Sequence, residues 1–75
     1  MLNAFVFLNT QVGCEADVLR EIRKIPRITE ALLVYGAYDI VLRIQSESLN
    51  DLRHMVAWKI RKLDYITATQ TLITH

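Results

Sequence analysis

The stretch 33–41 constrains the fold more than any other part of the chain, because two runs of β-favouring residues flank Gly36 there. Glycine adopts the positive φ that a tight reversal needs, and β-branched and aromatic residues favour extended backbone. The pattern predicts a β-hairpin with arms at residues 28–35 and 38–45. The flanking sequences indicate a strand and a helix before the hairpin, and a helix and a strand after it. The predicted order is therefore β-α-β-β-α-β.

The first predicted strand has two apolar faces. Phe5 and Phe7 lie on one face, opposite Ala4, Val6 and Leu8. A strand that is apolar on both faces is normally covered on both sides. Two helices cover only one face of the sheet in a chain of this order, so we expect Phe5 and Phe7 to contact a second copy.

Two helices are predicted on either side of the hairpin. The first spans residues 15–25, follows a break at Gly13 and is stopped by Pro26. The second begins at Ser48, whose side chain is placed to cap it, with Asp51 three residues later. Its apolar stripe consists of Leu49, Leu52, Val56, Ile60 and Leu63, with Met55 and Trp58 off the centre of the stripe.

Composition predicts one soluble domain, residues 1–75, that assembles with itself. The chain is 52% apolar, which is more apolar surface than one small core absorbs, so the surplus is expected to face another subunit. A net charge of +1 without a basic block does not fit nucleic-acid binding. No apolar run approaches the roughly 20 residues of a membrane-spanning helix, and no signal sequence is evident. We expect a cytoplasmic homo-oligomer.

The sequence offers no catalytic or metal-binding set. One cysteine, two histidines on different predicted elements and two glycines do not supply a zinc site, a phosphate loop or a nucleophile paired with a base. We predict no enzyme activity, no cofactor and no metal. Cys14 is interpreted as a small residue at a helix entrance rather than as a reactive thiol. RNA binding through Phe5 and Phe7 is a weaker alternative, because residues 39–44 supply no aromatic partner.

The hairpin turn places a carboxylate beside two phenols, in the run Tyr35, Gly36, Ala37, Tyr38 and Asp39. Such a loop can bind a zwitterion, with Asp39 attracting the ammonium group and backbone N–H groups receiving the carboxylate. The alternative is that Asp39 accepts hydrogen bonds from local backbone N–H groups and only shapes the turn. Both interpretations stay open at this point.

Two stretches are similar to motifs of the leucine-responsive regulatory protein (Lrp/AsnC) family. Residues 34–39 resemble the family's G-x-x-D turn, and residues 66–72 resemble its V-x-x-T-x-T-x closing strand. Gly13 and residues 25–28 also match the usual layout. In this order and spacing, the chain resembles the family's effector-binding domain, the regulation of amino-acid metabolism (RAM) domain, over nearly its whole length.

This resemblance implies the fold and the assembly. The fold it implies is a ferredoxin-like α+β sandwich, in which a four-stranded antiparallel sheet carries two helices on one face. Dimers form by sheet-to-sheet packing, here through Phe5 and Phe7, and associate into octamers or decamers. The partner is an amino-acid effector bound between dimers near the G-x-x-D turn.

The resemblance also implies a ligand site. Its predicted members either match a family motif or lie beside one: Tyr35, Gly36, Ala37, Tyr38, Asp39, Thr69 and Thr71. Gly36 and Asp39 match the turn. Thr69 and Thr71 match the closing strand, and the other three residues are included by adjacency.

The chain departs from the family in two respects. Typical members begin with a helix-turn-helix DNA-binding domain, whereas this chain starts in the first strand of the effector domain. We therefore expect a stand-alone domain without direct DNA binding, which acts through ligand sensing or with full-length relatives. Asp64 and Tyr65 also stand where the family usually has a glycine. The alternative function is a purely structural oligomerisation module that binds no ligand.

Overall fold

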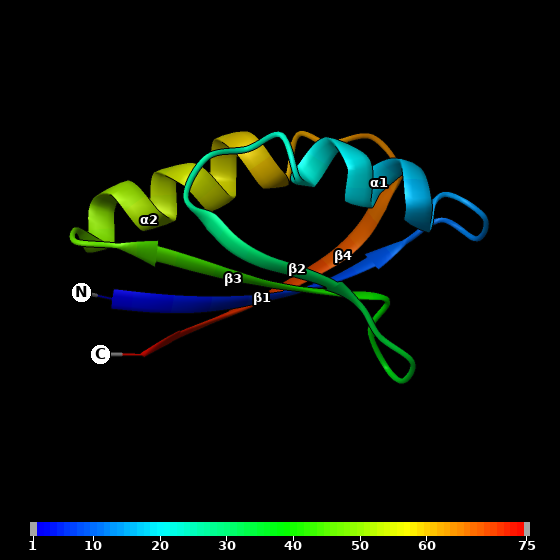
Figure 1. Ribbon diagram of the computed structural model, residues 1–75, viewed down its shortest axis with the longest axis horizontal. Coiled ribbons are helices and arrows are strands. Elements are labelled where there is room, and N and C mark those ends of the chain that lie inside the picture. Colours follow the sequence, from blue (N-terminus) through cyan, green and yellow to red (C-terminus); the bar gives the residue numbers. More distant parts are fainter. Residues whose placement is uncertain (1, 75) are drawn as a thin grey trace.

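The computed structural model describes residues 2–74. The elements follow the predicted order: β1 (Leu2–Thr10), α1 (Glu15–Ile22), β2 (Ile28–Leu33), β3 (Ile40–Ser46), α2 (Leu49–Met55), the π-helical segment η1 (Val56–Ile60) and β4 (Ile66–Thr74). The strands form one antiparallel four-stranded sheet in the order β2-β3-β1-β4. Both helices lie on one face of this sheet (Figure 1), so the predicted ferredoxin-like α+β fold is confirmed. No helix within residues 2–74 is long and apolar enough to cross a membrane.

Strand β1 lies in the middle of the sheet and alternates between its two faces. Ala4, Val6 and Leu8 are fully buried on the helix side, while Phe5 and Phe7 are half-buried on the other side. The remaining core residues come from β3 and the helical elements: Val18, Leu19, Ile22, Ile40, Leu42, Ile44, Leu52, Met55, Val56 and Ile60. Met55, which we expected at the edge of its helical stripe, is therefore part of the core. It lies three residues after Leu52, so the two side chains share one helix face.

Helix α1 is shorter than predicted. It begins after Gly13, whose φ is 86°, and ends at Ile22 rather than at Ile25. After the helix ends, the N–H of Ile25 donates to the carbonyl of Ile22, three residues back, which is the spacing of a 3₁₀ turn. Pro26 accounts for the early end, because proline disfavours helical backbone at the preceding residue and has no N–H to continue the ladder.

The hairpin is present, but its turn is wider than the tight turn we predicted. The loop spans residues 34–39 and is closed by the N–H of Val34, which donates to the carbonyl of Asp39 at 2.9 Å. Gly36 has a φ of 151°, which confirms the need for glycine there. The loop is wide because the N–H of Asp39 donates to the carbonyl of Leu8 in β1. The last loop residue therefore bonds to β1 before β3 begins.

The second helix starts as the sequence indicated and then changes type. The N–H of Asp51 donates to Oγ of Ser48 at 3.3 Å, so Ser48 is the N-cap. At the end of η1, the N–H of the C-cap residue Arg61 donates to the carbonyl of Val56, five residues back, at 3.1 Å. This spacing is that of a π-helix, which places side chains differently from an α-helix. The apolar periodicity of the sequence did not indicate this change.

Candidate functional site

Asp39 lies where the hairpin loop meets the end of β1. Its Oδ2 accepts a hydrogen bond from the backbone N–H of Thr10 at 2.9 Å. Within residues 2–74, Oδ1 of Asp39 makes no hydrogen bond. The Thr10 contact spans 29 positions in the sequence, so Asp39 does more than shape its own turn. One oxygen anchors the loop to the sheet, and the other is available.

Thr10 is a residue of this site that the sequence did not single out. It is 7% exposed, and its Oγ1 is buried without a hydrogen-bond partner among the described residues. Buried hydroxyl groups normally have a partner, so this atom is suited to bind a water or a ligand near Asp39. A threonine in a strand is ordinary, and only the folded chain brings it to the loop.

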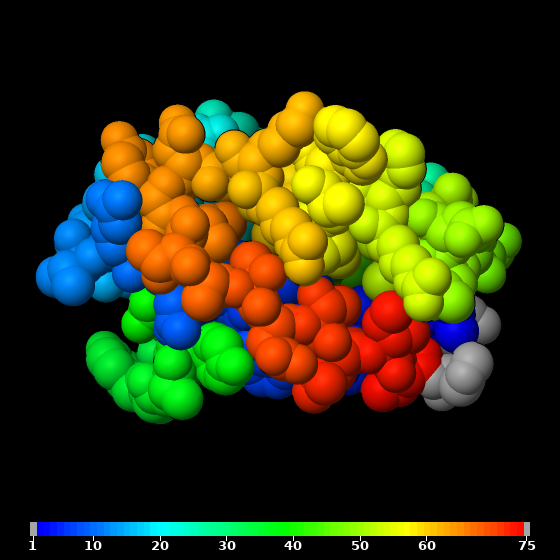
Figure 2. Space-filling model, turned by 180° about the vertical axis from the view of Figure 1, so that it is seen from behind, coloured from blue at the N-terminus to red at the C-terminus, as the bar shows by residue number. Residues whose placement is uncertain are grey.

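The tip of the loop is exposed and rich in free donors. Tyr35, Gly36 and Ala37 are exposed, and the loop, drawn in green, projects on the side away from the helices in Figure 2. Within residues 2–74, the backbone N–H groups of residues 35–38 make no hydrogen bond to backbone. Successive free N–H groups of this kind can receive a carboxylate.

The side chain of Tyr38 packs against Phe7 rather than lying at the exposed loop tip. Its ring centroid lies 5.3 Å from that of Phe7, with the rings inclined by 47°. Tilted aromatic pairs at this separation are favourable. Tyr38 therefore packs on the sheet face that carries Phe7, and its ring is not part of the exposed loop tip.

The two threonines of the predicted site lie in β4, on the helix-covered face. Thr69 pairs with Leu8, and Thr71 pairs with Val6; directly opposed residues of antiparallel strands share a face. The backbone N–H of Asp39 also donates to the carbonyl of Leu8. Asp39 and Thr69 therefore lie on opposite sides of Leu8 in the sheet. Their backbones are two strand spacings apart, or roughly 10 Å. Thr71 lies farther along β4, where it lines a cavity of about 300 Å³ beside α2 and η1. Within one copy, only Thr69 is in register with the loop.

The open face is the side of the sheet that carries no helix. Phe5 and Phe7 lie there next to Val41, and all three are half-buried. Leu72 pairs with Phe5 and is 50% exposed, and Leu32 pairs with Val41 and is 52% exposed. The register therefore joins these five side chains into one apolar surface across all four strands.

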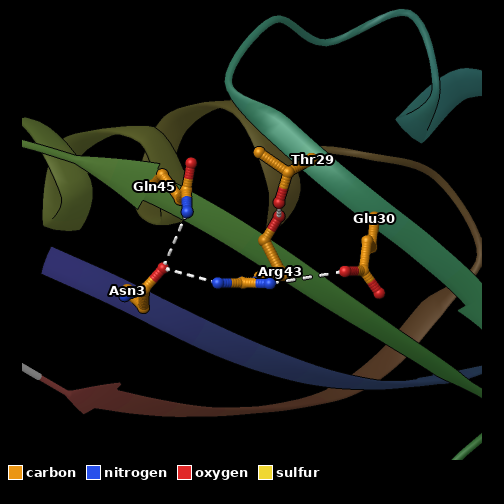
Figure 3. Close-up of polar contacts among 5 residues, drawn as sticks. All are labelled: Asn3, Thr29, Glu30, Arg43 and Gln45. Atoms are coloured by element: carbon orange, nitrogen blue, oxygen red, sulfur yellow. Dashed lines mark hydrogen bonds and ion pairs between the residues drawn. The ribbon is translucent and has the colours of Figure 1, made fainter. Parts of the chain in front are cut away.

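A polar cluster borders this apolar surface, toward the end of β3 (Figure 3). Oδ1 of Asn3 accepts hydrogen bonds from Nη2 of Arg43 at 3.4 Å and from Nε2 of Gln45 at 3.2 Å. Nη1 of Arg43 forms an ion pair with Glu30 at 3.4 Å, while its Nε is buried without a partner among the described residues. The sequence did not predict this cluster, because its residues meet only through strand pairing.

Four surface cavities of about 240 to 390 Å³ among residues 2–74 are lined by other parts of the chain than the hairpin loop 34–39. Residues 2–74 also contain no group of three His, Cys, Asp or Glu side chains that is able to hold a metal ion.

Several solved structures have the same fold. A hypothetical protein from Pyrococcus horikoshii is 35% identical with a TM-score of 0.93, covering 100% of this chain and 90% of that one. The structure of AsnC from Escherichia coli has a TM-score of 0.91 at 26% identity, over 97% of this chain and 50% of AsnC. A Neisseria meningitidis transcriptional regulator in complex with L-Met has a TM-score of 0.88 at 18% identity, over 99% and 49% of the two chains, which shows a common fold.

Sequence comparison gives the same result. The regulatory protein AsnC of Escherichia coli K12 is 33% identical over 57 residues, which are 76% of this chain and 38% of AsnC. The chain spans less than half the length of the curated relatives it matches. These relatives are transcription regulators, and the family is not an enzyme family. Since residues 3–74 match the Lrp/AsnC ligand binding domain, the chain belongs to that family.

Proposed function

We propose that this protein is an oligomeric amino-acid-sensing module and that a free amino acid binds at the loop 34–39. The α-ammonium group is held by Asp39 or by neighbouring strand carbonyls. The carboxylate is held by the free backbone N–H groups around Gly36. Thr69 and Thr71 add hydroxyl contacts across a subunit boundary. The partners that follow are further copies, as dimers and then octamers or decamers, and full-length relatives.

The observation that carries this proposal is the position of the Asp39 carboxylate. It is half-buried and fixed by the Thr10 N–H, yet Oδ1 makes no hydrogen bond within the described residues. A fixed, partly desolvated carboxylate with a free oxygen is a strong acceptor for an ammonium group. The complex of L-Met with the Neisseria meningitidis regulator supports the choice of an amino acid as the ligand class.

The open face supports the oligomeric part of the proposal. Exposed Leu32 and Leu72 extend the half-buried surface of Phe5 and Phe7, and contiguous apolar surfaces of this kind mark interaction sites. We propose that two copies pack open face to open face. The hairpin loop lies on the side of the sheet away from the helices (Figure 1), so such packing brings other chains near the loop.

The alternative is an assembly module without a ligand, and one contact favours it. Because Asp39 already binds the Thr10 N–H, a carboxylate at this position has a structural use in the absence of any effector. The two functions differ in whether the folded protein gains stability from an amino acid.

A thermal-shift screen with the twenty amino acids separates the two functions. A ligand that binds only the folded state at a hundred times its Kd stabilises it by about 2.7 kcal/mol. We expect one amino acid, or a chemically related few, to raise Tm. The matched controls are the N-acetyl derivative, which lacks the ammonium group, and the amide, which lacks the carboxylate. If all twenty leave Tm unchanged, the protein is an assembly module and the sensing proposal is wrong.

A further inference from the structure

A second site is indicated at the other end of the sheet from the hairpin loop. The connection between α1 and β2 passes beside α2 and η1 (Figure 1). Between them lies a groove of about 320 Å³, lined by Ile25, Pro26, Arg27, Asp51, His54, Met55, Trp58 and Lys59. Asp39 directly precedes β3, and the groove lies near the other end of that strand. Because a strand rises about 3.3 Å per residue, the two places are roughly 20 Å apart. The two sites are therefore distinct.

The groove has fixed apolar walls. Met55 is 8% exposed and is part of the core, and Ile25 is half-buried opposite it. Trp58 is 54% exposed, and its indole lies between His54 in α2 and Lys62, which follows η1. His54 is 5.8 Å away between ring centroids, and Nζ of Lys62 lies 4.6 Å from the indole centroid. The indole therefore forms one rim of the groove.

The charges of the groove favour a monoanion. Arg27 and Lys59 each contribute +1 and Asp51 contributes −1, so with a neutral His54 the lining carries +1. Neither Arg27 nor Lys59 forms an ion pair within residues 2–74. Asp51 lines a neighbouring cavity together with Arg27 and lies eight positions, roughly two helical turns, before Lys59, so Arg27 is the cation nearer to this carboxylate and Lys59 is the less compensated of the two. A single negative charge balances the lining.

The backbone on both sides of the groove is unusual. Arg27 has a φ of 74°, a left-handed conformation that costs a residue with a side chain roughly 1–2 kcal/mol. On the opposite wall, Trp58 and Lys59 lie in the π-helical segment η1. Strained residues and π-helical turns occur preferentially at functional sites. Arg27, Trp58 and Lys59, which all line the groove, therefore lie at two independent backbone irregularities.

We propose that this groove binds a small apolar monocarboxylate. An aromatic or branched aliphatic body packs on Met55 and against the edge of Trp58, and the carboxylate meets the side chains of Arg27 and Lys59. The volume is at the lower end of the range for small-molecule sites, which fits a single ring. Because such a ligand has no α-ammonium group, this site does not depend on Asp39 or on the proposed amino-acid site.

Fluorescence of the only tryptophan tests the proposal directly. Trp58 is the single tryptophan of the chain, so selective indole excitation reports on the rim of the groove. The probe is phenylacetate, which does not absorb under those conditions. We expect a saturable change in emission with phenylacetate. Binding should be at least about fivefold weaker for 2-phenylethanol and benzylamine, which keep the ring but lack the negative charge.

Variants locate the binding. Lys59→Gln combined with Arg27→Asn removes both cations while keeping a residue that tolerates positive φ, and should weaken phenylacetate binding about tenfold. Lys62→Gln is the matched control, because Lys62 touches the indole but does not line the groove. It should shift the baseline emission and leave the affinity unchanged.

Amide chemical shifts provide a second measurement that does not rely on the tryptophan. Titration with phenylacetate should move the backbone signals of residues 25–27 and 51–59 and leave those of 34–39 in place. An Asp39→Asn variant should bind phenylacetate as the unmodified chain does. The proposal is wrong if emission does not saturate, if Lys62→Gln weakens binding as much as the double variant does, or if the shifts cluster at the hairpin loop.

Discussion

The carboxylate of Asp39 accepts a hydrogen bond from the backbone N–H of Thr10, which lies 29 positions earlier in the chain, at 2.9 Å. Asp39→Asn keeps an oxygen for this bond and removes the negative charge. We therefore expect the fold and the oligomer to persist while amino-acid affinity falls by roughly 1.5–3 kcal/mol, the range for hydrogen bonds to charged groups. Calorimetric titration with the amino acid found in the thermal-shift screen measures the loss. Unchanged affinity would place the ligand elsewhere.

Asp39→Ala separates the structural role of this side chain from its binding role. The substitution leaves the Thr10 N–H without its acceptor, and an unpaired, partly buried donor costs about 1–3 kcal/mol. We expect that loss in urea unfolding of Asp39→Ala, with much less for Asp39→Asn. Equal stabilities of the two variants would show that the Thr10 contact contributes nothing measurable.

Phe7→Asp tests the open face. Phe7 packs against Tyr38 and lies beside Val41, so an aspartate there puts an unpaired charge into the proposed interface. We expect light scattering after size exclusion to show dissociation toward the 8.7 kDa monomer. Val12→Asp is the matched control, since Val12 is 98% exposed in the β1–α1 loop. A monomeric unmodified protein, or equal dissociation of both variants, would remove the sheet-to-sheet interface.

Gly36→Val tests the loop backbone. Gly36 has a φ of 151°, and a Cβ placed there meets no atom within 4 Å, so any cost comes from the backbone conformation and not from a clash. We expect a loss of about 1–3 kcal/mol in unfolding free energy, together with weaker amino-acid binding. Ala37→Val, in the same exposed loop, should stay within about 0.5 kcal/mol. Similar results for the two variants would mean that the glycine conformation is not required.

Ser48→Ala tests the start of α2. Loss of the hydrogen bond from the Asp51 N–H to Oγ of Ser48 should destabilise the protein by about 0.5–2 kcal/mol. Asn50→Ala, on the exposed side of the first turn, should change stability by less than about 0.5 kcal/mol. Chemical denaturation of both variants gives the comparison, and a neutral Ser48→Ala would contradict the cap.

DNA binding provides a further test. With nine basic and eight acidic residues and a net charge of +1, we expect no sequence-specific complex at physiological salt in a mobility-shift assay. The assay uses the promoter region of the protein's own gene, with an unrelated fragment of equal length as the control. A specific nanomolar complex would contradict the proposal that the module acts without direct DNA contact.

The element order and the alternation of β1 were predictable because they depend on local patterns. Phe5 and Phe7 on one face, opposite Ala4, Val6 and Leu8, follow from the two-residue period of a strand. Gly36 has the positive φ that its position in the turn indicated, and Gly13 lies at the break before α1 as expected. Ser48 caps its helix as its spacing to Asp51 suggested.

The parts that were not predicted depend on contacts between distant residues. The width of the hairpin loop is set by the bonds of Asp39 to β1, and neither the loop sequence nor turn preferences encode them. The contact of Arg43 with Asn3 spans 40 positions, and a local pattern cannot show it. The change to a π-helix at Val56 likewise has no signature in the apolar stripe.

The pairing of β1 with β4 has a consequence for synthesis. Asn3 pairs with Thr74, so the middle strand of the sheet, made first, receives its second neighbour only when residues 66–74 have left the ribosome. Until then β1 has one unpaired edge, and six of its nine residues are apolar. Folds dominated by such long-range pairing form slowly, so the unpaired edge of β1 is open to chaperones or to mispairing until β4 has been made.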